Sequence, residues 1–147
     1  MTGITNKAEY ALLILLDLLL LPPGAVTSTR EVAARRGLPP KLVPHLVSLL
    51  RSAGWIETSR GPGGGLSLSD RASAGALSVG QVLRAVGEYP RVKECGACPR
   101  VPACPLKDTW TQTRSVLDDI LSRTRLSDLA RRMRQTEQAS GSGGERP

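Results

Sequence analysis

Residues Leu38–Leu68, LPPKLVPHLVSLLRSAGWIETSRGPGGGLSL, decide the fold of this chain. Pro39–Pro40 suits a helix start, where a missing backbone N–H costs nothing, and leucines then recur at helical spacing. Trp55–Thr58 is β-prone, and Leu66–Leu68 alternates as a half-buried strand does. Between them lies Arg60–Gly65, whose glycines let the backbone turn and approach another surface closely. The stretch therefore predicts a helix followed by a two-stranded wing.

A shorter helix precedes this stretch. Thr27, Ser28 and Thr29 supply its N-terminal cap, and a tight turn at Gly37 ends it. Gly54 closes the following helix at the position where left-handed backbone is needed. Helix, tight turn, helix and wing, in that order, predict a winged helix-turn-helix. The expected fold class is mainly α with a small β-wing and a long C-terminal dimerisation helix.

The first helix is expected over residues 5–21 and is strongly apolar. Asp17 interrupts its apolar run, which is too short to span a bilayer, so no membrane association is expected. Because leucines cover more than one of its faces, the winged helix should bury one side, and another element or a second subunit should bury the other. Asp17 itself is expected to be a solvated surface charge.

Downstream of the wing, loops and helices alternate. Residues 71–76 are expected to form a small-residue loop, and Ser78 caps a short helix over 79–86. The Pro-, Gly- and Cys-rich stretch 89–105 has no periodicity, which predicts a long loop. A long helix over 106–122 and a short final helix follow. The expected domains are a winged helix-turn-helix (1–76), a cysteine loop with dimerisation helices (77–135) and a disordered tail (136–147).

Charge and cysteine content restrict the function. The net charge of +7 favours a polyanionic partner, with double-stranded DNA as the leading one. No signal peptide is evident. Three cysteines in a chain without export features indicate a reducing cytoplasm, where metal or redox chemistry is expected before a structural disulfide.

The winged helix supplies the predicted DNA contacts. A helix-turn-helix places the N-terminal part of its second helix in the major groove, where Lys41 and His45 point outward. Hydroxyls, backbone N–H groups and positive charge over Thr27–Arg30 favour phosphate, and Arg60 can enter a minor groove. A winged helix that binds protein is the alternative. The predicted DNA-binding residues are Thr27, Ser28, Thr29, Arg30, Lys41, His45, Arg51, Arg60, Gly61, Pro62, Gly63 and Gly64.

Cys95, Cys98 and Cys104 form the second candidate site. Three thiols within ten positions can converge on one metal centre, and thiolates bind iron–sulfur clusters or zinc. The only histidine, His45, lies in the reading helix, so a fourth ligand would be a carboxylate, a water or a group from a partner subunit. A redox disulfide between two cysteines, or three unrelated thiols, are the alternatives.

The long C-terminal helix carries a seam of residues that step by four and three. This spacing is typical of a coiled-coil-like helix packed on a partner. The predicted dimer residues are Leu106, Trp110, Thr113, Leu117 and Ile120.

Four stretches together resemble the family of IscR and NsrR, the Rrf-two family. They are Asn6–Leu12 (NKAEYAL), the wing Arg60–Gly65, the cysteine loop and Pro105–Trp110 (PLKDTW). The resemblance covers about residues 4–135. Members of this family are bacterial homodimeric transcription regulators with a winged helix-turn-helix and a long helix that crosses its partner's. Many hold a 2Fe–2S or 4Fe–4S cluster and sense iron supply, redox stress or nitric oxide.

The resemblance implies a role for each cysteine. Cys95, Cys98 and Cys104 match the cluster cysteines, and Glu9 matches the place where some members supply an acidic ligand from the other subunit. A plain surface carboxylate is the alternative for Glu9. Family members usually have more than the two residues that separate Cys95 from Cys98 here, and Lys107 stands where the iron-supply sensor has a histidine. The cluster type and the fourth ligand therefore stay open.

The expected function is a homodimeric bacterial transcription regulator, a repressor or an activator, that binds a pseudo-palindromic operator under control of an iron–sulfur cluster. The alternative is a cluster-free DNA-binding regulator whose cysteines form a thiol switch. An enzyme is not expected, because no catalytic base is placed near the cysteines and His45 lies elsewhere.

Overall fold

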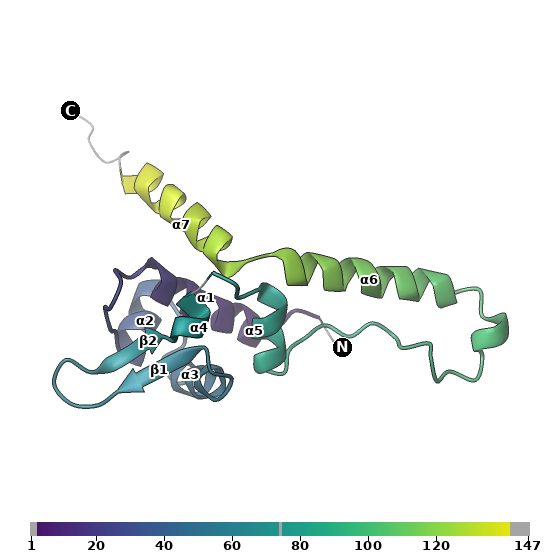
Figure 1. Cartoon of the computed structure of the whole chain (residues 1–147), viewed down its shortest axis with the longest axis horizontal. Helices are drawn as coiled ribbons and strands as arrows, with labels where there is room; N and C mark the ends of the chain where they lie inside the picture. The colour runs from purple at the N-terminus through teal and green to yellow at the C-terminus, as the bar shows by residue number, and fades with distance from the viewer. Residues whose placement is uncertain (1–2, 74, 142–147) are drawn as a thin grey trace.

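The computed structural model describes residues 3–73 and 75–141, which form a head and a projecting arm (Figure 1). The head comprises residues 3–88, and the arm comprises residues 89–123. The described elements are α1 (Asn6–Leu20), α2 (Thr29–Arg36), α3 (Val43–Ser52), β1 (Ile56–Ser59), β2 (Gly65–Leu68), α4 (Asp70–Ser73), α5 (Val79–Ala85), the 3-10 helix η1 (Val101–Ala103), α6 (Lys107–Arg123) and α7 (Leu126–Gly141).

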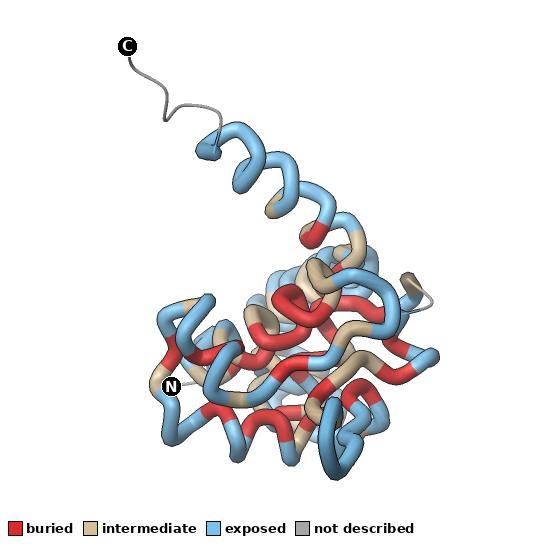
Figure 2. The backbone as a smooth tube through the Cα atoms, turned by 90° about the vertical axis from the view of Figure 1, so that its left-hand side faces the viewer, coloured by how far each residue is buried: buried red, intermediate tan, exposed pale blue. Residues whose placement is uncertain are grey.

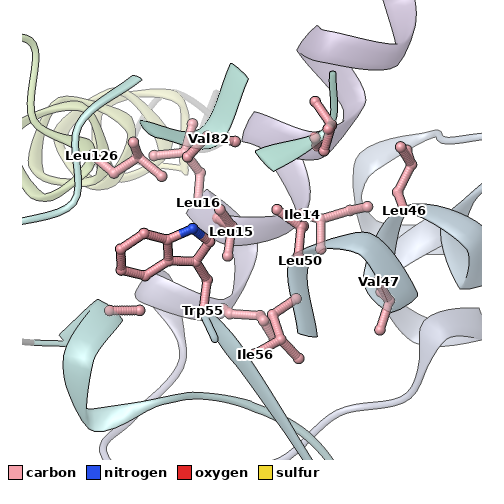
Figure 3. Close-up of a cluster of buried hydrophobic side chains, with 14 of the residues drawn as sticks. Ile14, Leu15, Leu16, Leu46, Val47, Leu50, Trp55, Ile56, Val82 and Leu126 are labelled. Atoms are coloured by element: carbon pink, nitrogen blue, oxygen red, sulfur yellow. The ribbon is translucent and has the colours of Figure 1, made fainter. Parts of the chain in front are cut away.

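The core of the head surrounds α1, which contacts α2, α3, α5 and α7. Ile14 and Leu15 of α1 are fully buried and face Leu50, Ile56 and other apolar side chains from the winged helix (Figure 3). Figure 2 shows that the buried residues lie mainly in the head, whereas the residues in the far part of α7 are exposed. The predicted core helix is therefore confirmed.

β1 and β2 form the predicted wing. They pair antiparallel, with Ile56 opposite Leu68 and Thr58 opposite Leu66. Thr27, which precedes α2, adds an isolated antiparallel bridge to Leu66. This bridge joins the wing to the segment that leads into α2. The predicted fold class, mainly α with a small two-stranded wing, is confirmed.

Helix ends follow the predicted cap residues. The Ser28 hydroxyl accepts a hydrogen bond from the Glu31 N–H at 3.1 Å, and the Ser78 hydroxyl accepts one from the Gln81 N–H at 3.3 Å. In both cases the side chain of that third residue, Glu31 or Gln81, accepts a hydrogen bond from the backbone N–H of the cap serine, which completes a capping box. Gly37 has φ 62° and ends α2 in the left-handed conformation.

The prediction that α3 begins at the two prolines is wrong. α3 begins at Val43, and the N–H of Leu42 donates to the Pro39 carbonyl at 3.0 Å in a turn. A residue before proline avoids the α region, so consecutive prolines keep Leu38 and Pro39 out of the helix. Lys41 therefore lies in the turn before α3, and Leu42 is 45% exposed instead of belonging to the apolar stripe.

Two segments expected to lack helix are helical. α4 occupies part of the expected loop 71–76, and the Ser69 hydroxyl caps it by accepting the Ala72 N–H at 3.2 Å. α7 runs to Gly141, so residues 136–141 of the expected disordered tail are helical. Residues 142–147 lie outside the described residues.

α6 projects from the head as a straight arm, and the preceding loop runs beside it to its outer end (Figure 1). At its inner end α6 contacts α5, and its one buried residue, Leu121, lies in its last turn. In the described part of the chain, no helix has both the length and the apolar character needed to cross a bilayer.

Candidate nucleic-acid interface and cysteine loop

α3 has one face in the core and the other in solvent. Val43, Leu46 and Leu50 are buried. His45 and Ser48 are exposed, and their spacing of three places them on the same outward face. His45 therefore lies where the sequence predicted it. Ser48 was missed, although its spacing from His45 was the signal that could have found it.

Exposed cations lie around this outward face. Lys41 stands in the turn before α3, and Arg51 stands in its last turn. Arg51 leans toward the wing, where its Nη1 donates to the Thr58 hydroxyl on β1 at 3.5 Å. Arg60 is exposed at the base of the wing, and its side chain makes no ion pair within residues 3–73 and 75–141. Long cationic side chains in such positions can bind phosphate oxygens.

The N-terminus of α2 adds an exposed hydroxyl and a cation. Ser28 and Arg30 are exposed, and Thr29 is half-buried. The first-turn N–H groups of a helix have no intrahelical acceptor, which suits them to an anion. The Glu31 carboxylate stays close by, because it accepts hydrogen bonds from the Thr27 hydroxyl and the Ser28 N–H. These two bonds lower the pKa of Glu31 from its ordinary value.

The tip of the wing depends on glycine. Gly61, Pro62 and Gly63 are exposed, and Gly61 has φ 86°. A Cβ on Gly64 would lie 2.5 Å from the Ser59 carbonyl oxygen, which is backbone and cannot move aside cheaply. The turn therefore excludes a side chain at position 64, and Arg60 is the long side chain at this edge.

Thr27 does not belong to the exposed set. It is 4% exposed, and its hydroxyl donates to Glu31 Oε2 at 2.7 Å and accepts from Arg35 Nη2 at 2.7 Å. Its N–H and carbonyl pair with Leu66 of β2. The prediction that Thr27 contacts DNA is therefore corrected, because all its polar groups are used within the head. Sequence proximity to Ser28 and Arg30 was misleading here.

Asp17 is buried, contrary to the prediction that it is a surface charge. It is 1% exposed and lies on the side of α1 that faces α2. Arg35 Nη2 donates to its Oδ2 at 2.7 Å, and Arg36 Nε donates to its Oδ1 at 2.7 Å. Arg36 also pairs with Glu137 of α7 at 2.8 Å. Two guanidinium groups therefore satisfy a carboxylate that would otherwise be costly to bury.

The three cysteines lie in the arm, on a loop built from consecutive turns. The Cys98 N–H donates to the Cys95 carbonyl at 3.2 Å, and the Val101 N–H donates to the Cys98 carbonyl at 3.1 Å. η1 and a weaker contact from the Lys107 N–H to the Cys104 carbonyl, at 3.4 Å, complete the loop. All three thiols are free and half-buried.

The donor chemistry of this loop fits a cluster, but its geometry does not gather the donors. Thiolates are the ligands that iron–sulfur clusters prefer. Across residues 3–73 and 75–141, no three Cys, His, Asp or Glu side chains converge closely enough to hold a metal ion. Glu9 is exposed on the first turn of α1, in the head, whereas Cys95, Cys98 and Cys104 lie in the arm. Within the part of the chain that the structure describes, the monomer therefore presents a set of soft donors and no preformed centre.

An interaction network ties the start of the cysteine loop to α6 and α5. The Tyr89 hydroxyl donates to Asp118 of α6, and the Arg84 guanidinium of α5 lies 4.1 Å from the centre of the Tyr89 ring. Arg114 pairs with Asp118 at 3.9 Å and with Glu94, next to Cys95, at 3.3 Å. Burial first, and then the bond to Asp118, raise the pKa of Tyr89.

The outer face of α6 is apolar and exposed. Val116 is 59% exposed and Ile120 is 56% exposed. Together with Thr113 and Leu117 they line a shallow hollow. Thr113, Leu117 and Ile120 were in the predicted dimer seam, whereas Val116 was missed. Leu106, which caps α6, is 50% exposed, and Trp110 is half-buried.

Comparisons with known proteins agree with this arrangement. The model of the Rrf2 family, described as iron-dependent transcriptional regulator, matches residues 4–132. The regulator IscR of Vibrio vulnificus is 31% identical over 129 residues, which cover 86% of this chain and 76% of that protein. The structure of CymR, the global cysteine regulator of B. subtilis, superposes with a TM-score of 0.73 at 28% identity, covering 88% of this chain and 97% of that one.

A further solved structure is the oxidised form of Staphylococcus aureus CymR, with a TM-score of 0.66 at 27% identity. It covers 87% of this chain and 95% of the CymR chain. The family match spans most of the chain, and it includes both the winged helix and the cysteine loop. The chain therefore belongs to the Rrf2 family and is a transcription regulator, not an enzyme.

Proposed function

We propose that this regulator binds a pseudo-palindromic DNA operator in the bacterial cytoplasm as a homodimer, with one head on each half-site. The observation that carries the proposal is the exposed face of α3, with Arg51 and Arg60 beside it and Arg30 at the start of α2. α3 would lie in a major groove and Arg60 in the adjacent minor groove. The first turn of α2 would bind phosphate.

The outer face of α6 supports the homodimer. Val116 and Ile120 are large apolar side chains that lie together and are more than half exposed. Contiguous exposed apolar surface marks an interaction site, and a second α6 could cover it as the helices of a coiled coil cover each other. The resulting two-fold symmetry would place two heads on half-sites one helical turn apart.

Control of DNA binding is assigned to the cysteine loop. Cys95, Cys98 and Cys104 would hold an iron–sulfur cluster, with Glu9 of the second subunit as the candidate fourth ligand. A bound cluster would supply a redox-active group to this loop, and the three cysteines that hold it would be more ordered with the cluster than without it. The residues of the loop can alter operator affinity only as far as they favour one arrangement of the two heads over another.

A thiol switch is the second candidate, favoured by the three free, half-buried thiols and by the similarity to CymR. In this case hydrogen peroxide would oxidise two thiols to one disulfide and would itself be reduced to two molecules of water. The lack of a preformed metal centre in the described residues is compatible with this candidate.

The visible absorption spectrum of protein purified without oxygen, with iron and sulfide assays, separates the two candidates. Cluster bands that disappear in Cys95→Ala, Cys98→Ala or Cys104→Ala, but persist in the same-loop control Ala97→Ser, would support the cluster. Colourless protein that resists reconstitution, but loses or gains operator affinity on peroxide treatment, would support the thiol switch. Glu9→Ala tests the fourth ligand only in the first case.

DNA binding itself is tested with duplexes selected from a random-sequence pool by the wild-type protein. Arg60→Ala should weaken binding to the selected duplex by about 1–3 kcal/mol, because it removes the wing's only long cation. Affinity should also fall steeply with salt, as phosphate contacts require. Failure to select any sequence from the pool would argue against operator binding.

A further inference from the structure

Thr27 is attached to the wing by both of its backbone polar groups. Its N–H donates to the Leu66 carbonyl at 3.0 Å, and its carbonyl accepts from the Leu66 N–H at 2.6 Å. A Cβ on Gly65 would lie 2.5 Å from the Thr27 carbonyl oxygen. β2 therefore packs directly on the backbone of Thr27, and glycine at position 65 is what allows this close approach.

The side chain of Thr27 is attached to α2. Its hydroxyl donates to Glu31 and accepts from Arg35, both at 2.7 Å. Glu31 completes the capping box of α2 with Ser28. The backbone of Thr27 is therefore bound to the wing, and its hydroxyl is bound to the first and last turns of α2. In this way Thr27 joins the wing to α2.

A buried charge fixes this junction to the core. The Nη2 group of Arg35 donates hydrogen bonds to both the Thr27 hydroxyl and the Asp17 carboxylate, at 2.7 Å each. Asp17 is 1% exposed and lies on α1, the central helix of the head. Removing one partner from such a buried pair is costly, so Arg35 has little freedom to move. The position of the Thr27 hydroxyl is therefore set by α1.

We propose that Thr27 is a positioning residue for DNA recognition, which acts through the wing and does not touch DNA. It sets the place of Arg60 relative to the N-terminus of α2, so that minor-groove and phosphate contacts are made together. This inference rests on the proposed operator binding, in which Arg60 enters a minor groove.

The principal test replaces the hydroxyl without changing the shape of the side chain. Thr27→Val should lower affinity for the selected duplex about tenfold, within the range for losing one DNA-contacting arginine. Thr27→Ser keeps the hydroxyl and should bind as the wild type does. Thr136→Val makes the same chemical change on the exposed face of α7 and should have no effect on affinity.

A double-mutant cycle tests whether Thr27 acts through Arg60. In the Thr27→Val protein the wing is already displaced, so Arg60→Ala should cost only a small part of what it costs in the wild type. Hydroxyl-radical footprints of Thr27→Val should lose the wing's minor-groove protection and keep the major-groove protection made by α3. The DNA affinity of Thr27→Val should fall with salt concentration as steeply as that of Arg60→Ala, because the same cation loses its contact with DNA in both variants.

Gly65→Ala provides a second route to the same result if Thr27→Val proves poorly folded by circular dichroism. Its Cβ displaces β2 from Thr27 while the hydroxyl stays in place, and it should reproduce the loss of wing protection. Wild-type affinity in Thr27→Val or in Gly65→Ala, equal losses in Thr27→Val and Thr27→Ser, or full additivity with Arg60→Ala would each overturn the inference. A wild-type protein that selects no duplex would overturn the proposed operator binding as well.

Discussion

Asp17 is the residue on which the electrostatics of the head depend. Its carboxylate accepts hydrogen bonds from Arg35 at 2.7 and 3.2 Å and from Arg36 at 2.7 Å. Arg36 in turn pairs with Glu137. One buried carboxylate thus connects α1, α2 and α7. Its contribution is structural, because it holds α2 in place for whatever α2 contacts.

Asp17→Asn should destabilise the protein by about 3 kcal/mol. This value is at the lower end of the range for breaking a buried ion pair, because Arg35 keeps access to water. The control is Asp119→Asn, which removes an exposed carboxylate paired with Arg123 and should cost at most about 1 kcal/mol. Urea unfolding followed by circular dichroism measures both. Equal effects of the two substitutions would contradict the assignment of Asp17 to the core.

Glu31 should make stability depend on pH in the acid range. Hydrogen bonds from Thr27 and Ser28 lower its pKa from the ordinary value of 4.5. The unfolded chain therefore binds this proton at a higher pH than the folded chain does. The stabilisation is fully present above pH 4.5 and is lost as the pH falls through the lowered pKa.

The comparison is between wild type and Glu31→Gln, with urea midpoints measured across the acid range. The difference between the urea midpoints of the two proteins should be constant near neutral pH and should become smaller in acid. Glu57→Gln alters an exposed carboxyl whose side chain has no hydrogen-bond partner within the described part of the chain. The urea midpoint of Glu57→Gln should change with pH as that of the wild type does. If the difference between Glu31→Gln and the wild type stays constant down to acid pH, Glu31 does not contribute to the pH dependence of stability.

Single residues were predictable from sequence only where their environment is local. The outward position of His45 follows from helical spacing in the apolar stripe of α3. The burial of Asp17 depends on Arg35, which is 18 residues away in another helix. The burial of Thr27 depends on Arg35, 8 residues away in α2, and on Leu66 of β2. No pattern in the adjacent sequence encodes these contacts, so both residues were placed on the surface.

At the scale of elements, two sets of contacts hold the arm: one where α6 turns into α7, and one at the entrance of the cysteine loop, where Arg84 of the head lies over the Tyr89 ring. The turn from α6 to α7 contacts the start of α5, where the Val79 N–H donates to the Thr124 carbonyl at 2.9 Å. The loop entrance is tied to α6 by Tyr89 and Asp118. The second connection lies close to Cys95, so it would be affected by any rearrangement of the cysteine loop.

The ionisation of Tyr89 reports whether this second connection exists in solution. Burial and the hydrogen bond to Asp118 favour the neutral phenol and raise its pKa above the ordinary value of 10.0. The associated stability is present below pH 10.0 and is lost as the pH rises through the raised pKa. Asp118→Asn removes the carboxylate, so Tyr89 should then ionise at a lower pH than before.

Tyr10→Phe makes this measurement selective, since the chain has two tyrosines and Tyr89 is then the only one. Tyrosinate absorbance is titrated in this background with and without Asp118→Asn, and with Asp119→Asn as the control on the neighbouring position. A titration that does not respond to Asp118→Asn would show that the loop entrance is not bound to α6.

Element boundaries were predicted well where a cap encodes them. Ser28, Ser78 and Gly37 mark helix ends through local hydrogen bonds or a left-handed backbone, and all three were found in the sequence. The start of α3 was misplaced because Pro39 and Pro40 permit a helix start without requiring one. α7 was predicted too short because its last two turns are polar, and helix in such a segment leaves no apolar pattern.

At the scale of the whole molecule, the protein divides into a head that buries its own apolar side chains and an arm that leaves apolar side chains exposed to solvent. The large buried side chains lie in the head and at the inner ends of α6 and α7, whereas α6 leaves Val116 and Ile120 in solvent (Figures 1 and 2). A helix of 17 residues with a single buried one is poorly supported by its own chain. This imbalance is the physical reason to expect a second copy along α6.

Ile120→Glu should therefore prevent the proposed homodimer from forming and leave a monomer. It places a charge at the inner end of the apolar face of α6, where dimerisation would bury it without a partner. Thr111→Glu is the matched control, because residue 111 lies on the opposite side of the helix and is exposed. Sedimentation equilibrium measures the mass, and circular dichroism shows whether α6 remains helical.

The same pair of variants separates the role of α6 in assembly from its role in DNA binding. A monomeric Ile120→Glu protein should keep weak binding to a single half-site and lose the cooperative binding to the full operator, because each head still carries its own α3 and wing. Thr111→Glu should bind the full operator as the wild type does. If Ile120→Glu remains dimeric, the two-fold contact lies elsewhere, and the apolar groove between α1 and α7 around Leu16 and Met133 is the next surface to test.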